Sequence, residues 1–377
     1  MKEKELEYFY PYRADKKYGY RVFNNRYSAD EYYKYENDPY YEFINKLSNG
    51  HEELAGYIAD DFSSWTNWNS AGRNIFSFSE ELLLMLEKTD VNEISYDMFH
   101  LPYDNFYLSL KPLKIKANNK NESYIDGVYV HLERSEMESI VPMSERDPNM
   151  GDDYYEPEYK LLIYFHFVGN FENFVKENPN EVIFDEDIML SWNYALSFPE
   201  YEDYVTVGEA IEIEIDKFYS QVYQSSGETE IKKAKIKKEY KEFVEKTIRV
   251  LVNSLLYLSQ PKDKIISKEE YPENLPFNYN RKLKFAKTKK QRKKIEKKIN
   301  ETGFSKILFF GNSNIKNTTE YNDSHRKSSH WRRGHWRKQS FGKQFNQKRM
   351  IWIKPVLINK SKQNIQPKGH VYIVKKN

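Results

Sequence analysis

Charge is divided so unevenly along this chain that two parts of opposite sign are expected. Residues 281–377 hold 28 Lys and Arg against four acidic residues, a net charge of +24. The whole chain has 59 basic and 57 acidic residues, so residues 1–280 keep 31 and 53, a net charge of −22. This segregation predicts a basic end that binds a polyanion and an acidic body that attracts the same end. The total of +2 is a cancellation.

The apolar pattern before the basic end predicts an α+β body. Runs rich in aromatic and β-branched residues, bounded by Asn, Gly, Asp and Pro, predict a mixed or antiparallel sheet. These runs are residues 105–115, 124–133, 159–169 and 189–198. A first helix is expected over 76–90, with Ser79 as its cap. A long middle helix is expected over 240–261, where apolar residues recur every three or four positions until Pro261.

Four regions follow from these patterns. Residues 1–70 form a tyrosine-rich arm and helix, and the first 45 carry 11 of the 32 tyrosines, which suits either an ordered arm or a segment that folds on its partner. Residues 71–260 form an acidic α+β recognition domain, and 261–300 a basic helical linker. Residues 301–377 form a small basic module in which strand-like runs surround a basic loop. We expect this module to engage nucleic acid.

Several classes of protein are excluded by composition. The chain has no cysteine, which excludes disulfides, thiolate zinc sites and a cysteine nucleophile. It has no apolar stretch of roughly 18 residues and no apolar signal region at its start, so a soluble cytoplasmic protein without a membrane partner is expected. Phosphate-binding, dinucleotide and zinc-protease motifs are absent, and no cofactor is expected.

The stretch HWRRGHWR at residues 330–337 repeats a His-Trp-Arg triplet after five positions, and His325 precedes it by the same step. A five-residue step fits neither one face of a helix nor one face of a strand, and the neighbouring cations repel a metal ion. A metal site is therefore not expected. A solvated basic surface remains open, with the tryptophans anchoring the loop and Gly334 permitting a turn.

Nucleic-acid binding explains more of this stretch. Arginine grips phosphates in a bidentate manner, and tryptophan stacks on unpaired bases, so interleaved cations and aromatic rings suit single-stranded RNA. The residues predicted to bind nucleic acid are Arg326, Lys327, Trp331, Arg332, Arg333, Trp336, Lys338, Gln339 and Arg349.

Catalysis is the sharper alternative within that reading. Metal-free RNA cleavage needs a base, an acid and cations on the phosphate. His330 and His335 are the candidate base and acid, and Arg337 is the candidate that stabilises charge, together with Arg333. The surrounding positive charge favours neutral imidazole, which helps the base and hinders the acid. Gln339, Gly342 and Trp352 would support this site.

Residues 328–359 resemble the C-terminal signature of a family carried by phages, plasmids and integrating elements, typified by a type V-A anti-CRISPR protein. Runs within residues 100–110, 124–133 and 251–261 resemble the family's sheet and middle helix more loosely. The positions that carry the signature are His330, Arg332, Gly334, His335, Trp336, Arg337, Gln339, Gly342, Trp352, Ile353 and Pro355.

The resemblance implies a mobile-element protein that lowers the amount of a target nuclease by acting on its mRNA during translation. One part would recognise the emerging target polypeptide, and the basic end would meet RNA or the ribosome. The partners implied are therefore mRNA and a nascent polypeptide. Two alternatives stay open: a stand-alone, metal-independent, toxin-like endoribonuclease, and a non-enzymatic DNA- or RNA-binding accessory protein of a mobile element.

Overall fold

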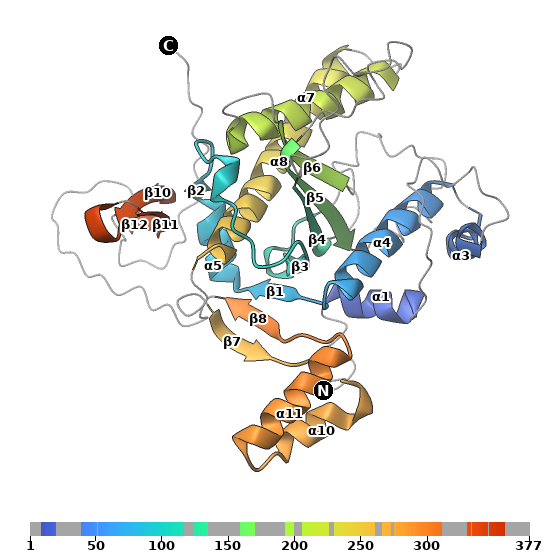
Figure 1. The fold of residues 1–377 in the computed structure, drawn as a ribbon. Helices are drawn as coiled ribbons and strands as arrows, with labels where there is room; N and C mark the ends of the chain where they lie inside the picture. Colours follow the sequence, from blue (N-terminus) through green and yellow to red (C-terminus); the bar gives the residue numbers. More distant parts are fainter. Residues whose placement is uncertain are drawn as a thin grey trace, which may run out of the picture.

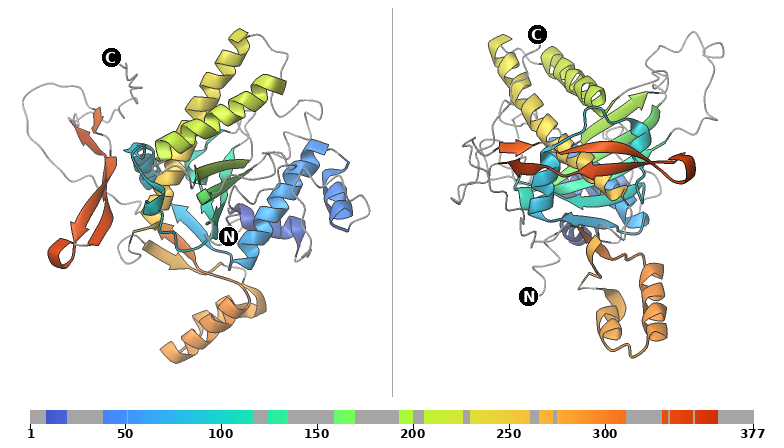
Figure 2. Two further views of the ribbon diagram at one scale, coloured as in Figure 1. Left: turned by 45° about the horizontal axis from the view of Figure 1, so that its top comes forward. Right: turned by 90° about the vertical axis from the view of Figure 1, so that its left-hand side faces the viewer.

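The computed structural model describes residues 9–19, 39–50, 52–116, 124–134, 159–169, 193–199, 206–225, 230–260, 266–272, 275–310, 330–332, 334–345 and 347–358. It confirms the predicted α+β class (Figure 1). A seven-stranded mixed sheet carries helices on both faces, and two basic projections extend from this body, a β-ribbon and a helical hairpin (Figure 2).

The main sheet has the strand order β6-β5-β4-β3-β1-β8-β7. Its strand β1 pairs in parallel with β3 and β8, and the other neighbours are antiparallel. The predicted strands before residue 200 are confirmed as β3 to β6. The strand bounds are β1 (Ile75–Phe78), β3 (Asn105–Ser109), β4 (Ile125–Glu133), β5 (Tyr159–Gly169), β6 (Asn193–Pro199), β7 (Ile266–Glu270) and β8 (Ile307–Phe310).

One face of this sheet packs against α5 (Glu80–Glu87), α7 (Val207–Ser225) and α8 (Glu230–Leu258). Strand alternation sends Phe76, Phe106 and Phe165 into this core, where Leu251 and Leu255 of α8 are also buried. The middle helix is thus confirmed, and it begins earlier than predicted, at Glu230. Its apolar stripe supplies much of the burial that holds the sheet.

The first predicted helix, over residues 76–90, is only half right. Its helical part begins at Glu80, where the Ser79 hydroxyl accepts a hydrogen bond from the Leu82 amide at 3.3 Å. Residues Ile75–Phe78 form β1 instead, and all four are buried. Phe76 and Phe78 are two positions apart, which is the spacing of one strand face and not of a helix, so the prediction extends the helix over residues that form a strand.

The opposite face of the sheet is covered by α1 (Tyr10–Tyr18), α3 (Pro39–Ser48) and α4 (Glu52–Ser70). Tyrosine and tryptophan dominate this second core, and Tyr107 and Tyr129 enter it from the sheet. The described parts of the predicted tyrosine-rich arm are therefore ordered helices that form a layer of the body.

A buried carboxylate ties two of these helices together. Asp61 of α4 has no exposed surface and accepts hydrogen bonds from the hydroxyls of Tyr10, at 2.8 Å, and Tyr18. Burial acts to raise the pKa of Asp61, but the His166 imidazole 3.8 Å away, the charge of Lys17 and the hydrogen bond from Tyr18 together hold that pKa below its usual value. The carboxylate is therefore held as an anion that fixes α1 on α4.

A helical hairpin joins β7 to β8 at the edge of the sheet. It contains the single turn Pro276–Asn278, α10 (Tyr279–Lys284) and α11 (Lys289–Glu301). Within the predicted linker 261–300 this part is helical, whereas Ile266–Glu270 forms β7. Figure 2 shows it, in orange, projecting past the sheet edge, well apart from the red ribbon. Shorter elements of the body are β2 (Thr89–Asp90), Tyr96–Met98 and Lys111–Leu113.

Candidate nucleic-acid interface

The predicted basic loop at HWRRGHWR is itself a β-ribbon. Strand β10 (Gly334–Phe341) pairs antiparallel with β11 (Gln347–Ile353), and β9 (His330–Arg332) pairs antiparallel with β12 (Val356–Ile358). Both ladders keep one register, since His330 lies opposite Ile358 and His335 opposite Ile353. At the far end Gly342, with φ +81°, begins the turn through Lys343–Phe345. The tandem triplet therefore extends along a two-stranded ribbon rather than closing a loop.

Gly334 fixes the ribbon to the body. Its amide donates to the Lys88 carbonyl at 3.2 Å, and Gly334 and His335 pair in parallel with Thr89 and Asp90 of β2. A Cβ at position 334 would lie 2.7 Å from the Thr89 hydroxyl and 2.7 Å from the Pro355 ring. Glycine is needed here because two strands approach each other closely.

Two tryptophans complete the attachment. The rings of Trp336 and Trp352 stack with centroids 6.1 Å apart. The Trp336 indole donates to the Asn253 side-chain oxygen at 2.7 Å, and the Trp352 indole donates to the Thr89 hydroxyl at 3.1 Å. Trp336 is buried, and the Trp352 ring meets Tyr257 of α8 edge-on at 5.5 Å. Both rings anchor the ribbon, so the Trp336 ring, for which base stacking was predicted, is engaged with the body.

The partner of Trp336 is itself held in place. Asn253 has no exposed surface, and its amide donates to the carbonyls of Leu86 and Thr89 at 2.9 and 3.0 Å. This asparagine interrupts the apolar run of α8, which is a signal that the sequence contained and the prediction missed. One buried amide thus joins α8, the end of α5, β2 and the ribbon.

The opposite side of β10 and β11 is open. Because strand side chains alternate, residues next to the buried Trp336 point away from the body. His335, Arg337 and Arg349 are exposed, and Gln339 is half-buried. The Arg337 guanidinium donates to the Gln339 side-chain oxygen at 2.6 Å, and Gln339 lies opposite Arg349 in the ladder. We call these four residues the outer face.

The outer face is cationic and uncompensated. Among the described residues no carboxylate pairs with Arg337 or Arg349, and the Arg349 guanidinium lies 5.1 Å from the centre of the Phe341 ring. Lys338 instead points to the body side, where its ammonium lies 3.7 Å from an Asp97 oxygen. Planar guanidinium groups beside an amide and an imidazole are a donor set that suits phosphate.

The structure does not describe the side chains of the remaining predicted site residues. Arg326, Lys327 and Arg333 lie outside the described residues, and so do the side chains of His330, Trp331 and Arg332, whose backbones form β9. The convergence of His330 and His335 that catalysis requires therefore stays a prediction.

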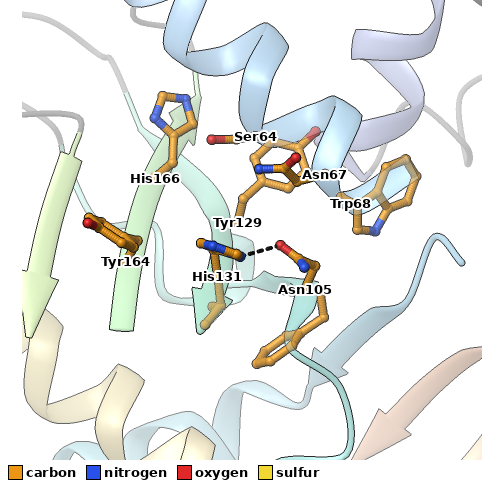
Figure 3. Close-up of a pocket in the computed structure, with 10 residues that line it drawn as sticks. Ser64, Asn67, Trp68, Asn105, Tyr129, His131, Tyr164 and His166 are labelled. Carbon is orange, nitrogen blue, oxygen red and sulfur yellow. Dashed lines mark hydrogen bonds between the residues drawn. The ribbon is translucent and has the colours of Figure 1, made fainter. Parts of the chain in front are cut away.

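A second place where histidines gather is a small pocket between α4 and the sheet (Figure 3). His131, Asn105, Tyr164 and His166 line it, and its volume of about 30 Å³ is enough for one or two water molecules. A ring nitrogen of His131 lies 2.7 Å from the Asn105 oxygen, and one of His166 lies 2.7 Å from the Asn193 oxygen. A pocket of this size does not admit a substrate, and it carries no assignment.

Two further searches of the described residues gave negative findings. They contain no group of three or more His, Asp or Glu side chains placed to hold a metal ion. None of their helices is both long and apolar enough to cross a membrane.

Comparison with known proteins gives one family. A model described as AcrVA2-like, the anti-CRISPR type V subtype A2 family, matches residues 76–360. That span runs from β1 to the end of the ribbon. No curated protein matches the sequence. Among solved structures the chain is similar to a crystal structure of AcrVA2, with 13% identity over 88% of this chain and 83% of that chain and a TM-score of 0.34.

Proposed function

The chain belongs to the anti-CRISPR type V subtype A2 family, and on that premise we propose that it represses or degrades the mRNA of a target nuclease while that mRNA is translated. The ribbon engages the RNA through its outer face. The acidic body recognises the nascent target polypeptide. This division of labour follows the division of charge along the chain.

The observation that carries the proposal is the split between the two sides of the ribbon. Trp336 and Trp352 hold one side on α8 and β2, while Arg337 and Arg349 are left on the other without a carboxylate among the described residues. Structural anchoring explains the tryptophans, but it does not explain cations kept exposed on the far side. A phosphate backbone is the partner that such cations fit.

Transcript abundance is the direct test. Cells would carry a type V nuclease gene, or the same gene without its start codon, with and without this protein. We expect the wild-type protein to lower the translated transcript several-fold and leave the untranslated one unchanged. The pair Arg337→Gln and Arg349→Gln should abolish that loss. The charge-matched pair Lys46→Gln and Lys246→Gln, at exposed positions of α3 and α8, should not.

Either of two results would refute the proposal. One is an unchanged translated transcript in the presence of the wild-type protein, and the other is full activity of the outer-face pair. Cleavage of purified RNA in EDTA that depends on His335, which is exposed beside Arg337, would instead identify the chain as the nuclease itself.

A further inference from the structure

The helical hairpin between β7 and β8 carries more positive charge than a connection between two strands needs. We call residues 275–304 the basic hairpin; it contains 11 Lys and Arg and two Glu. All 11 cations are exposed. Two of them form ion pairs one helical turn apart, Arg292 with Glu296 at 3.3 Å and Lys297 with Glu301 at 3.8 Å. The other nine have no carboxylate partner among the described residues.

This charge stands on a folded support. Leu275, Tyr279, Ile299 and Phe304 form a small core of their own, separate from the two cores of the body. At its base the Phe304 ring lies 4.7 Å from the guanidinium of the buried Arg73. Like charges repel along α11, so a purely structural connection between two strands would gain nothing from them. Their retention on an ordered support points to a polyanionic partner.

Two phenylalanines stand in the solvent among these cations. Phe277 and Phe285, which flank α10, are each 67% exposed. Phe277 and the next residue, Asn278, both have a left-handed backbone, with φ of 56° and 55°, which a bulky side chain rarely adopts. The turn is held by Asn280, which accepts from the Leu275 amide at 2.9 Å and donates to the Pro272 carbonyl at 2.7 Å. An exposed ring on a strained, braced turn is a feature of binding sites.

A cavity lies where the basic hairpin meets the sheet. It has a volume of about 340 Å³, within the range of small-ligand sites, and it is lined by Tyr103, Tyr271, Glu296 and Asn300 among others. Glu296 and Asn300 follow Lys293 along one face of α11, since they are three and seven positions further on. Aromatic rings, an amide and carboxylates are groups that stack on a nucleobase and accept from its amino groups.

We propose that the basic hairpin is a second docking surface for single-stranded RNA. Its lysines contact successive phosphates, and Phe277 and Phe285 stack on unpaired bases. The basal cavity accepts a base that leaves the stack. The exposed rings favour a single strand over a duplex, because paired bases offer no open face to an aromatic side chain. That the strand is RNA rests on the proposed function.

Binding of a fluorescent 20-nucleotide RNA to the full-length protein over a salt series tests the proposal. Replacing Lys289, Lys290, Lys293 and Lys294 by Gln should weaken binding about tenfold or more at physiological salt, because each lost phosphate contact lowers the salt slope by about 0.7. The same four positions changed to Arg keep the charge and should bind like the wild type. Phe285→Ala should weaken binding about tenfold, whereas Leu84→Ala, at a 45% exposed site on α5, should not.

The outer-face pair Arg337→Gln and Arg349→Gln separates this inference from the proposed function. If that pair loses RNA affinity while the four-Gln protein keeps it, the basic hairpin does not bind RNA and the proposed function stands. If the four-Gln protein loses affinity and the wild type leaves transcripts unchanged, the hairpin binds RNA and the proposed function fails. Tighter binding of a duplex DNA of the same sequence than of the single strand would overturn the hairpin proposal.

Discussion

The ribbon and the basic hairpin carry the same sign of charge on opposite kinds of support. The ribbon is a two-stranded element that depends on the body, through Gly334, Trp336 and Trp352, for its position. The basic hairpin has its own core around Ile299. A lone two-stranded ribbon is marginal in water, so the outer face exists only while the body is folded. If both surfaces bind RNA as proposed, binding at the ribbon would depend on the folded body, whereas binding at the basic hairpin would not.

The largest expected effect comes from removing the ribbon's main anchor. Trp336→Ala should cost about 3–5 kcal/mol of docking free energy, because a buried aromatic ring is lost and the Asn253 side-chain oxygen loses its donor. Hydrogen exchange should then accelerate throughout β10 and β11. Trp336→Phe keeps a ring but removes the hydrogen bond, and should cost about 1–2 kcal/mol. Unchanged exchange in Trp336→Ala would show that the ribbon stands without the body.

Ile299→Ala addresses the other side of the comparison. This residue has no exposed surface in the hairpin core, and its truncation should cost about 2–4 kcal/mol locally. Amide protection should fall in α10 and α11 while protection in the ribbon and in α8 stays as in the wild type. If the ribbon also loosens, the two projections are not independent and the contrast fails.

Gly334→Ala should have an intermediate effect. The added methyl group meets the Thr89 hydroxyl and the Pro355 ring at 2.7 Å, and such overpacking costs about 1–3 kcal/mol. The measurement is the protease sensitivity of residues 330–358. Gly56→Ala in α4 is the control, because nothing lies within 4 Å of its added methyl group and a helical alanine is slightly favourable. Equal protection of the ribbon in both variants would contradict the close approach described at Gly334.

The smallest effect is expected at the exposed contact between ribbon and body. Lys338 and Asp97 are each about half exposed, and their side chains lie 3.7 Å apart. A double-mutant cycle with Lys338→Ala and Asp97→Ala should give a coupling of about 0.2–1 kcal/mol that disappears in high salt. A coupling that survives high salt would mean that charge, and not only the tryptophans, holds the ribbon.

Local patterns predicted the parts of the fold that depend on neighbours in the sequence. The alternation in residues 124–133 gives β4, and the three- and four-residue steps before Pro261 give the end of α8. Phe76 and Phe78 were misread because an apolar cluster beside a capped helix looks helical until its partners, β3 and β8, are known. The sequence of one strand does not predict which distant strand it pairs with.

The candidate site divides in the same way. Charge and the tandem triplet predicted the cations of the outer face, since exposed Arg337 and Arg349 need no partner to be recognised. The role of the tryptophans depends on Asn253 and Thr89, which lie 83 and 263 positions from their respective partners. The sequence shows the cations of the basic hairpin but predicts only a linker there, because the exposure of Phe277 and Phe285 is recognisable only in the folded chain.

The position of β8 has a consequence for how the chain is made. β1 lies inside the sheet with β8 as one of its two neighbours, and β8 ends only at Phe310. During synthesis on the ribosome, one edge of β1 therefore stays unpaired until about four-fifths of the 377 residues have been translated. Sheets closed by such distant contacts fold slowly, and unpaired edges invite association in the meantime. A gene interrupted before residue 307 therefore leaves an open sheet rather than a smaller folded body.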